Sequence, residues 1–276
     1  MLKPKGTAFV ASALVLVGSA LPCAAQSLEP PGGRGRETAL DSRRPGGDFA
    51  TGDGRRTLGS FPKNLGRSFV GVFSRESLAP FLVGAAATAS LSRADGRAGT
   101  LIAGSCPGCG QAGATLGGAA LVPVVGAFFV AGRFAPQGRF RAASYDFAQA
   151  LIVSEVYTGA LKYSVGRERP DASSRLSFPS GHSSAAFTLA TVADRHYGWR
   201  VGVPAYVLAS GIGLSRVERN KHYLSDVLAG ATLGIIVGRT VTRVNDERPA
   251  RRGRLSVAPA SDLHGTGVGL NVSASW

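Results

Sequence analysis

The stretch 168-ERPDASSRLSFPSGHSSAAF-187 joins a polar loop to a run of small and apolar residues. The change occurs at 179-PSGH-182, where Ser180 suits the cap of a helix and Gly181 permits close approach to the backbone. We therefore predict that a helix begins here. The first N–H groups of such a helix lack intrahelical partners, and together with the helix dipole they favour an anion. His182 would lie at this anion site, where it could hand a proton to a leaving oxygen.

Small and apolar residues continue on both sides of this stretch, in segments separated by short charged loops. Few positions alternate as they would in strands, so the segments indicate helices. Helices with apolar faces bury them against one another. We therefore predict an all-α fold, a six-helix bundle within residues 69–245. The expected helices are 77–92, 114–132, 144–163, 183–197, 201–214 and 225–243.

The two ends of the chain differ from this domain. Residues 1–25 combine lysines, an uncharged run and a small-residue cleavage site, which is typical of a signal peptide removed on export. A retained anchor is the alternative, although the run is short for a membrane span. Residues 26–68 are rich in Gly, Pro and Arg, so we expect a disordered linker. Residues 246–276 contain two alternating segments around glycines, which predicts a β-hairpin.

Basic residues predominate in the chain. Its 31 Lys and Arg against 17 Asp and Glu give a net charge of +14, which favours a polyanionic partner: nucleic acid, an acidic membrane surface or a phosphorylated substrate. Export argues against nucleic acid. In an exported chain Cys106 and Cys109 would close a small disulfide loop or remain as two thiols. Neither a thioredoxin-like context nor the further ligands of a zinc site accompany them.

The apolar segments are short for membrane spans. The uncharged runs 77–92, 201–215 and 227–238 fall below the roughly 20 residues that a comfortable span needs. Only the segment 98–132 is long enough. The lengths of these runs are therefore compatible both with a soluble helical bundle and with a bundle that is only partly embedded in a membrane.

Another candidate histidine lies forty residues after His182, in 215-SRVERNKHYLSD-226. His222 and Asp226 are four residues apart, so they would share one face of a helix that begins near Lys221. A carboxylate there accepts the proton-bearing ring nitrogen, which fixes the tautomer and leaves the other nitrogen as a nucleophile. Taken alone, the spacing is more typical of an ordinary polar pair at a helix start.

Three basic residues accompany the two histidines: Lys162, Arg169 and Arg216. Gly166 and Pro170 would break the helix after Lys162, so that the chain turns back around a ligand. Guanidinium groups bind phosphate oxygens in pairs, and a lysine acts as a point charge. These cations would repel a divalent metal ion, and the sequence shows no further His, Asp or Glu at a spacing typical of metal ligands. We therefore predict a phosphate-like anion, with no metal and no cofactor.

The three clusters are Lys162-x6-Arg-Pro, 179-PSGH-182 and Ser215-Arg-x5-His-x3-Asp. Together, and in this order, they resemble the signature of the type 2 phosphatidic acid phosphatase superfamily. That superfamily includes lipid phosphate phosphatases, bacterial nonspecific acid phosphatases and vanadium haloperoxidases. The resemblance implies their helical-bundle fold over about residues 75–243.

The resemblance also implies a mechanism. His222 would attack phosphorus to give a phosphohistidine, Asp226 would orient it, and His182 would protonate the leaving alcohol before water releases phosphate. The phosphate oxygens would be held by a set of cations and helix-start residues: Lys162, Arg169, Ser180, Gly181 and Arg216. Arg167 lies outside the signature, and we expect it to be a bystander.

The activity implied is hydrolysis of phosphate monoesters or diphosphates. An exported and moderately apolar bundle favours lipid-linked substrates, such as a phosphatidate-like lipid, a prenyl diphosphate or lipid A. The alternatives are a soluble periplasmic acid phosphatase, a vanadate-dependent haloperoxidase and a non-enzymatic polyanion-binding envelope protein. Each reading places the protein in the bacterial cell envelope, periplasmic or membrane-associated. Because six crossing helices after a cleaved signal peptide would turn the site toward the cytoplasm, we expect a soluble or partly embedded bundle that faces the periplasm.

Overall fold

The computed structural model of the chain describes residues 56–102, 104, 109–118, 120–136, 138–246, 254–261 and 268–275. The predicted signal peptide, most of the predicted linker and the predicted pairing of Cys106 with Cys109 lie outside the described residues.

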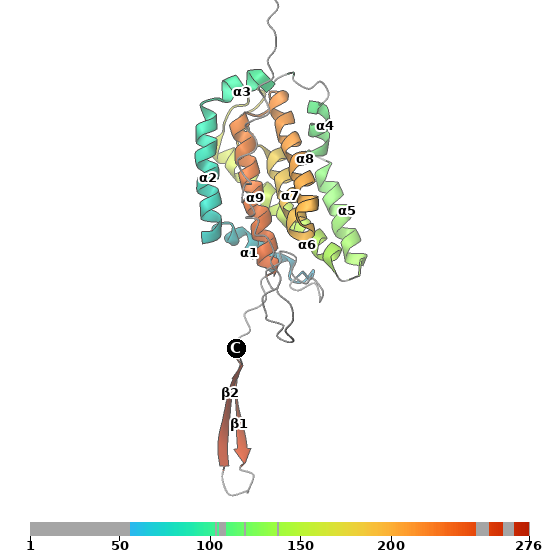
Figure 1. Ribbon diagram of the computed structural model, residues 1–276, viewed down its shortest axis with the longest axis vertical. Coiled ribbons are helices and arrows are strands. Elements are labelled where there is room, and N and C mark those ends of the chain that lie inside the picture. Colours follow the sequence, from blue (N-terminus) through green and yellow to red (C-terminus); the bar gives the residue numbers. More distant parts are fainter. Residues whose placement is uncertain are drawn as a thin grey trace, which may run out of the picture. The chain divides into compact units, whose positions relative to one another are not determined.

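The domain is built from helices, as predicted (Figure 1). Those of the described residues are α1 (Phe61–Gly71), α2 (Arg75–Ser92), α3 (Asp95–Ile102), α4 (Cys109–Leu116), α5 (Leu121–Phe134), α6 (Arg139–Val165), α7 (Gly181–Tyr197), α8 (Trp199–Glu218) and α9 (Leu224–Asp246). The strands β1 (Arg254–Ser261) and β2 (Val268–Ser275) pair antiparallel, with Arg254 opposite Ser275. The helical part differs from the expected six helices, because α1 and α3 were not anticipated and the segment 114–132 is divided between α4 and α5.

Two glycines interrupt the predicted helix 114–132. A Cβ atom at Gly117 would lie 2.4 Å from Cγ2 of Ile212, and one at Gly118 would lie 2.5 Å from the carbonyl oxygen of Ala114. The Gly118 position is also 3.0 Å from Nε2 of His182. The chain thus passes close to α7 and α8 at a point where no side chain fits, and glycine favours a helix less than other residues.

The helical domain begins earlier than the predicted boundary at residue 69. Helix α1 starts at Phe61, with a proline in its first turn, where the missing N–H is harmless. Its buried residues are polar, and Nδ2 of Asn64 donates to the hydroxyl of Tyr145 at 3.1 Å. Leu65 and Phe69 of the same helix are partly buried and pack against the apolar core, so α1 has an apolar face that the sequence prediction missed.

Helix α7 lies in the middle of the bundle and packs against α6, α8 and α9 (Figure 1). Valines from three helices form a fully buried cluster there: Val153 of α6, Val192 of α7 and Val237 and Val241 of α9. Burial of apolar side chains of this size stabilises the fold by about 1.5–3 kcal/mol each.

Glycines on α9 bring its backbone against α7. A Cβ atom at Gly230 would lie 2.5 Å from the carbonyl oxygen of Ser180, and one at Gly234 would lie 2.4 Å from that of Ser184. Gly230 and Gly234 are four residues apart and so lie on one face of α9. Only hydrogen atoms fit in this contact, which therefore fixes the start of α7 beside the start of α9.

A polar network crosses the interior near the chain's first described residue. The fully buried Asp146 of α6 accepts hydrogen bonds from Arg56 at 2.8 and 3.0 Å and from Nδ2 of Asn245 at 2.7 Å. Nε2 of His196 lies 2.8 Å from the same carboxylate, and Arg56 also binds Asp246 at 2.6 Å. The network joins α6, α7 and α9 to the residues that precede α1.

The outer surface of several helices is apolar. Exposed large apolar residues lie on α2 (Leu78, Phe81, Leu82, Val83), α5 (Val122, Val124, Phe128, Val130, Phe134) and α8 (Trp199, Val201, Val203, Val207, Leu208). By length and composition, two described segments could cross a membrane, Gly110–Phe134 and Leu224–Asp246; α1 with α2, bent by 55°, would add a third if the pair is one span. Contiguous exposed apolar surface of this kind is typical of contact with lipid or another protein.

The contact between α7 and α9 generates a stability prediction. In Gly234→Ala the added methyl group meets backbone atoms of α7, so we expect the free energy of unfolding to fall by about 1–3 kcal/mol. Gly211→Ala on α8 is the matched control, since no atom lies within 4 Å of its Cβ position. This control should instead gain about 0.5–1 kcal/mol. Thermal or denaturant unfolding measures both, and equal effects would contradict the close contact.

Candidate active site

The predicted site residues lie where α6 and α8 end and where α7 and α9 begin. Lys162 is in the last turn of α6, which ends at Gly166 in a left-handed conformation with φ of 58°. Glycine adopts this conformation without steric cost and commonly ends helices. Nζ of Lys162 donates to the carbonyl oxygen of Leu176 at 2.7 Å. The end of α6 is thereby tied to the loop that leads to α7.

The start of α7 agrees with the predicted helix start. Ser180 is the N-cap, in an extended conformation, and its hydroxyl oxygen accepts from the N–H of Ser183 at 3.4 Å. The N–H of Ser180 donates to the carbonyl oxygen of Asp226 at 3.0 Å. A Cβ atom at Gly181 would lie 3.8 Å from Cε of Lys162. The loop before α7 therefore joins the beginning of α9 and the end of α6.

His222 is buried and its ring is held by a carbonyl group. Nδ1 lies 2.7 Å from the carbonyl oxygen of Ser177, whereas Oδ2 of Asp226 is 3.8 Å away. A carbonyl oxygen only accepts, so Nδ1 carries the hydrogen and Nε2 keeps its lone pair. The prediction that Asp226 accepts this hydrogen directly was therefore wrong. Because α9 begins at Leu224, His222 lies before the helix and the i,i+4 geometry does not apply.

Asp226 instead organises the backbone and side chains around His222. Its fully buried carboxylate accepts from the hydroxyl of Ser177 at 2.6 Å, from the N–H of Tyr223 at 2.9 Å and from Arg167 at 2.8 Å. Ser177 thus links the two predicted residues, since its hydroxyl binds Asp226 while its carbonyl oxygen binds His222. The sequence pattern did not single out Ser177.

Arg167 is a member of this cluster, so the expectation of a bystander was wrong. Its guanidinium group binds Asp226 and Asp95, each at 2.8 Å, and lies 4.0 Å from the centre of the Tyr223 ring. Asp95 in turn accepts from the N–H of Ser225 at 3.0 Å. Asp95 stands far from the signature in sequence, and no spacing rule could have linked it to Arg167.

The remaining predicted cations, Lys162, Arg169 and Arg216, lie near one another. The Nε atoms of Arg169 and Arg216 are buried and have no hydrogen-bond partner among the residues that the structure describes. An unsatisfied buried donor is costly unless a ligand accepts from it. Burial, followed by the charge of Arg169, lowers the pKa of Lys162 to about 8. This concentration of positive charge beside the start of α7 favours a bound anion.

Both histidines are neutral near pH 7. Burial, followed by the charge of Arg216, lowers the pKa of His182 to about 4. Burial also lowers the pKa of His222, although Asp226 acts in the opposite direction. A neutral His222 has a free Nε2 lone pair, and a bound anion would raise the pKa of His182 toward its ordinary value.

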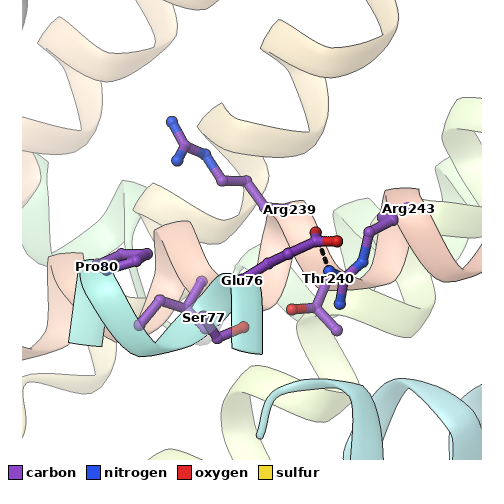
Figure 2. A pocket seen from close by; sticks show the side chains of 7 residues that line it. Glu76, Ser77, Pro80, Arg239, Thr240 and Arg243 are labelled. Carbon is purple, nitrogen blue, oxygen red and sulfur yellow. Dashed lines mark hydrogen bonds and ion pairs between the residues drawn. The ribbon is translucent and has the colours of Figure 1, made fainter. Parts of the chain in front are cut away.

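Other features of the described residues do not compete with this site. No group of three or more His, Cys, Asp or Glu side chains in the described part of the chain is placed to hold a metal ion. A small pocket of about 250 Å³ lies between the first turns of α2 and the last turns of α9 and contains none of the predicted site residues. Figure 2 shows Glu76 paired with Arg243 there, while Arg239 extends away from the pair.

Two curated relatives are phosphatases by name. A lipid A 1-phosphatase from Porphyromonas gingivalis is 39% identical over 134 residues, which are 46% of this chain and 29% of that protein. A decaprenylphosphoryl-5-phosphoribose phosphatase from Mycobacterium tuberculosis is 36% identical over 112 residues, 37% of this chain and 62% of that protein. The chain thus spans less than two thirds of the length of either relative.

The fold has a counterpart among solved structures. A transmembrane PAP2 type phosphatidylglycerolphosphate phosphatase from Bacillus subtilis superposes with a TM-score of 0.53 at 23% identity, over 63% of this chain and 98% of that chain. The family model of the PAP2 superfamily matches residues 144–250, the part that contains every predicted catalytic and phosphate-binding residue. Residues 144–250, the part of the chain that carries the candidate site, thus match the PAP2 superfamily, the type 2 phosphatidic acid phosphatases.

Proposed function

We propose that the protein is a metal-independent phosphatase that hydrolyses lipid-linked phosphate monoesters or diphosphates through a phosphohistidine on His222. The observation that carries the proposal is the hydrogen bond from Nδ1 of His222 to the carbonyl oxygen of Ser177, together with the buried Nε atoms of Arg169 and Arg216, which have no hydrogen-bond partner among the described residues. A nucleophilic nitrogen thus lies in a site suited to an anion, which phosphoryl transfer requires.

In the proposed reaction, Nε2 of His222 bonds to phosphorus as the bond from phosphorus to the leaving oxygen breaks. His182 gives its proton to that oxygen, and a water molecule then attacks the phosphohistidine to release phosphate. Arg169, Arg216 and Lys162 balance the charge on the phosphoryl oxygens. Asp226 acts on His222 through Ser177 and through its own charge, since its carboxylate lies 3.8 Å from Nδ1.

Lipid-linked substrates and a membrane location are supported by two independent features. The names of both curated relatives specify lipid-linked phosphates, lipid A and a decaprenylphosphoryl compound. The apolar residues exposed on α2, α5 and α8 also suit a protein in contact with lipid. We therefore propose a membrane-associated enzyme of the cell envelope.

Removal of the nucleophile tests the proposal. We expect His222→Ala to lower kcat for phosphate release from phosphatidate by at least about 10³-fold and to abolish labelling of the protein by phosphate after rapid quenching. The assay compares phosphatidate, a prenyl diphosphate and lipid A with a soluble aryl phosphate. Tyr223→Phe, which keeps the ring beneath Arg167, is the control and should retain activity. Full activity in His222→Ala would exclude the mechanism.

The same substrates separate the alternatives. Hydrolysis of the aryl phosphate alone would indicate a soluble acid phosphatase. Vanadate-dependent oxidation of halide would indicate a haloperoxidase, and binding of polyanions without phosphate release would indicate a non-enzymatic protein.

The role of His182 as the acid has its own signature. Loss of the acid matters most when the leaving group is poor, so His182→Asn should lower kcat for an alkyl phosphate by about 10²–10⁴-fold but kcat for a nitrophenyl phosphate far less. Similar losses for both esters would contradict a proton-donating role.

The pH profile gives a further check on His182. Its pKa of about 4 means that the protonated form becomes scarcer as the pH rises above that value. We therefore expect kcat/KM of the wild type for the alkyl phosphate to fall as the pH rises above that value, with the fall absent in His182→Asn. A profile in which both proteins show the same fall would assign it to another group.

A further inference from the structure

A groove with a volume of about 820 Å³ runs between α2, α6 and α9. Volumes of about 300–1,000 Å³ are usual for small-molecule sites. Most of the lining is apolar or small: Val72, Phe73, Leu78, Phe81, Gly84, Ala85 and Ala89 from the first part of the domain, Tyr157 and Leu161 of α6, and Ala229, Leu233 and Ile236 of α9. Several of the α2 residues are exposed, so the groove opens on the side of the bundle.

One end of the groove reaches the Asp226 cluster. Arg167, Phe178, Pro179 and Ser225 line this end. Pro179 directly precedes the N-cap of α7, Ser225 directly precedes Asp226, and Arg167 binds Asp226. The apolar groove is therefore continuous with the loop that forms the candidate phosphate site.

The groove follows α2 for most of its length. Its lining residues on this side extend from Ser74 to Ser92, and a helix rises 1.5 Å per residue, so the groove is about 27 Å long. Contact between α2 and α9 closes its floor, where a Cβ atom at Gly84 would lie 2.2 Å from Cγ2 of Thr232. A long, apolar, side-opening channel with cationic groups at one end complements a molecule with a long apolar tail and an anionic head.

We propose that this groove binds one hydrocarbon chain of the phosphorylated lipid whose head group occupies the site of His182 and His222. The inference rests on the proposed function and adds to it the position of the lipid's hydrocarbon chain. It assigns to Ala85 and its neighbours on α2 the selection of long-chain over short-chain substrates. The occupant approaches from the side of the bundle, where α2 is exposed.

A pair of adjacent alanines offers a matched test. Ala85 lines the groove, whereas Ala86 is exposed on α2 but is not among the lining residues. With the full chain in mixed micelles, we expect Ala85→Trp to lower kcat/KM for a long-chain phosphatidate at least about tenfold by filling the groove. Its kcat/KM for a short-chain phosphatidate should remain within about twofold of the wild type. Ala86→Trp should change neither value.

Three results would overturn the proposal: an unchanged long-chain value in Ala85→Trp, an equal loss for both substrates, or the same loss in Ala86→Trp. Thermal unfolding of both variants shows whether either substitution damages the fold. If Ala85→Trp lowers kcat/KM equally for both substrates and also lowers Tm, the smaller substitution Ala85→Leu decides. It must still lower kcat/KM for the long-chain phosphatidate more than kcat/KM for the short-chain one.

A binding measurement tests the groove independently of phosphate hydrolysis. A phosphatidate with a photoreactive group in its chain should label residues of α2, α6 or α9 that line the groove, and Ala85→Trp should remove this labelling. If the wild type hydrolyses no phosphate ester but shows this labelling, the proposed function is wrong and the groove is still supported as a lipid-chain site. If it hydrolyses phosphatidate but is labelled only elsewhere, the groove does not bind the hydrocarbon chain and the proposed function is still supported.

Discussion

The contact between the α7 and α9 backbones is the constraint on which the site depends. Gly230 and Gly234 bring α9 within reach of the carbonyl oxygens of Ser180 and Ser184, and a larger residue would push the helices apart. The first residues of each helix are thereby placed side by side. The start of α7, where we predict an anion to bind, and the carboxylate at the start of α9 consequently lie in one site, although they are over forty residues apart in sequence.

Asp226 converts this helix contact into an ordered site. Its carboxylate holds Ser177, Tyr223 and Arg167, and its carbonyl oxygen holds the N–H of Ser180. Every one of these partners lies in a loop or at a helix end, where the backbone has few regular hydrogen bonds of its own. A single buried carboxylate therefore positions both the segment before α7 and the segment before α9.

The sequence predicted the helical class and the helix start at 179-PSGH-182, because each depends on local composition or on a spacing within one segment. The roles of the candidate residues stay predictions. The sequence did not predict Ser177 or Arg167, whose roles come from contacts between segments. The break at Gly117 and Gly118 was also missed, since the cause lies on α7 and α8. The prediction of a direct bond between His222 and Asp226 was wrong because it assumed a helix that begins near Lys221, whereas α9 begins three residues later, at Leu224.

The network around Asp146 shows that the residues before the first helix contribute to the folded domain. Arg56 precedes the first helix, yet it supplies the positive charge opposite a carboxylate that water cannot reach. A chain shortened to the start of α1 would keep every helix of the described residues but would leave that carboxylate without its guanidinium partner, and removing one partner of a buried ion pair costs several kcal/mol. The folded domain thus includes residues that precede its first helix, since Arg56 lies five residues before α1 begins.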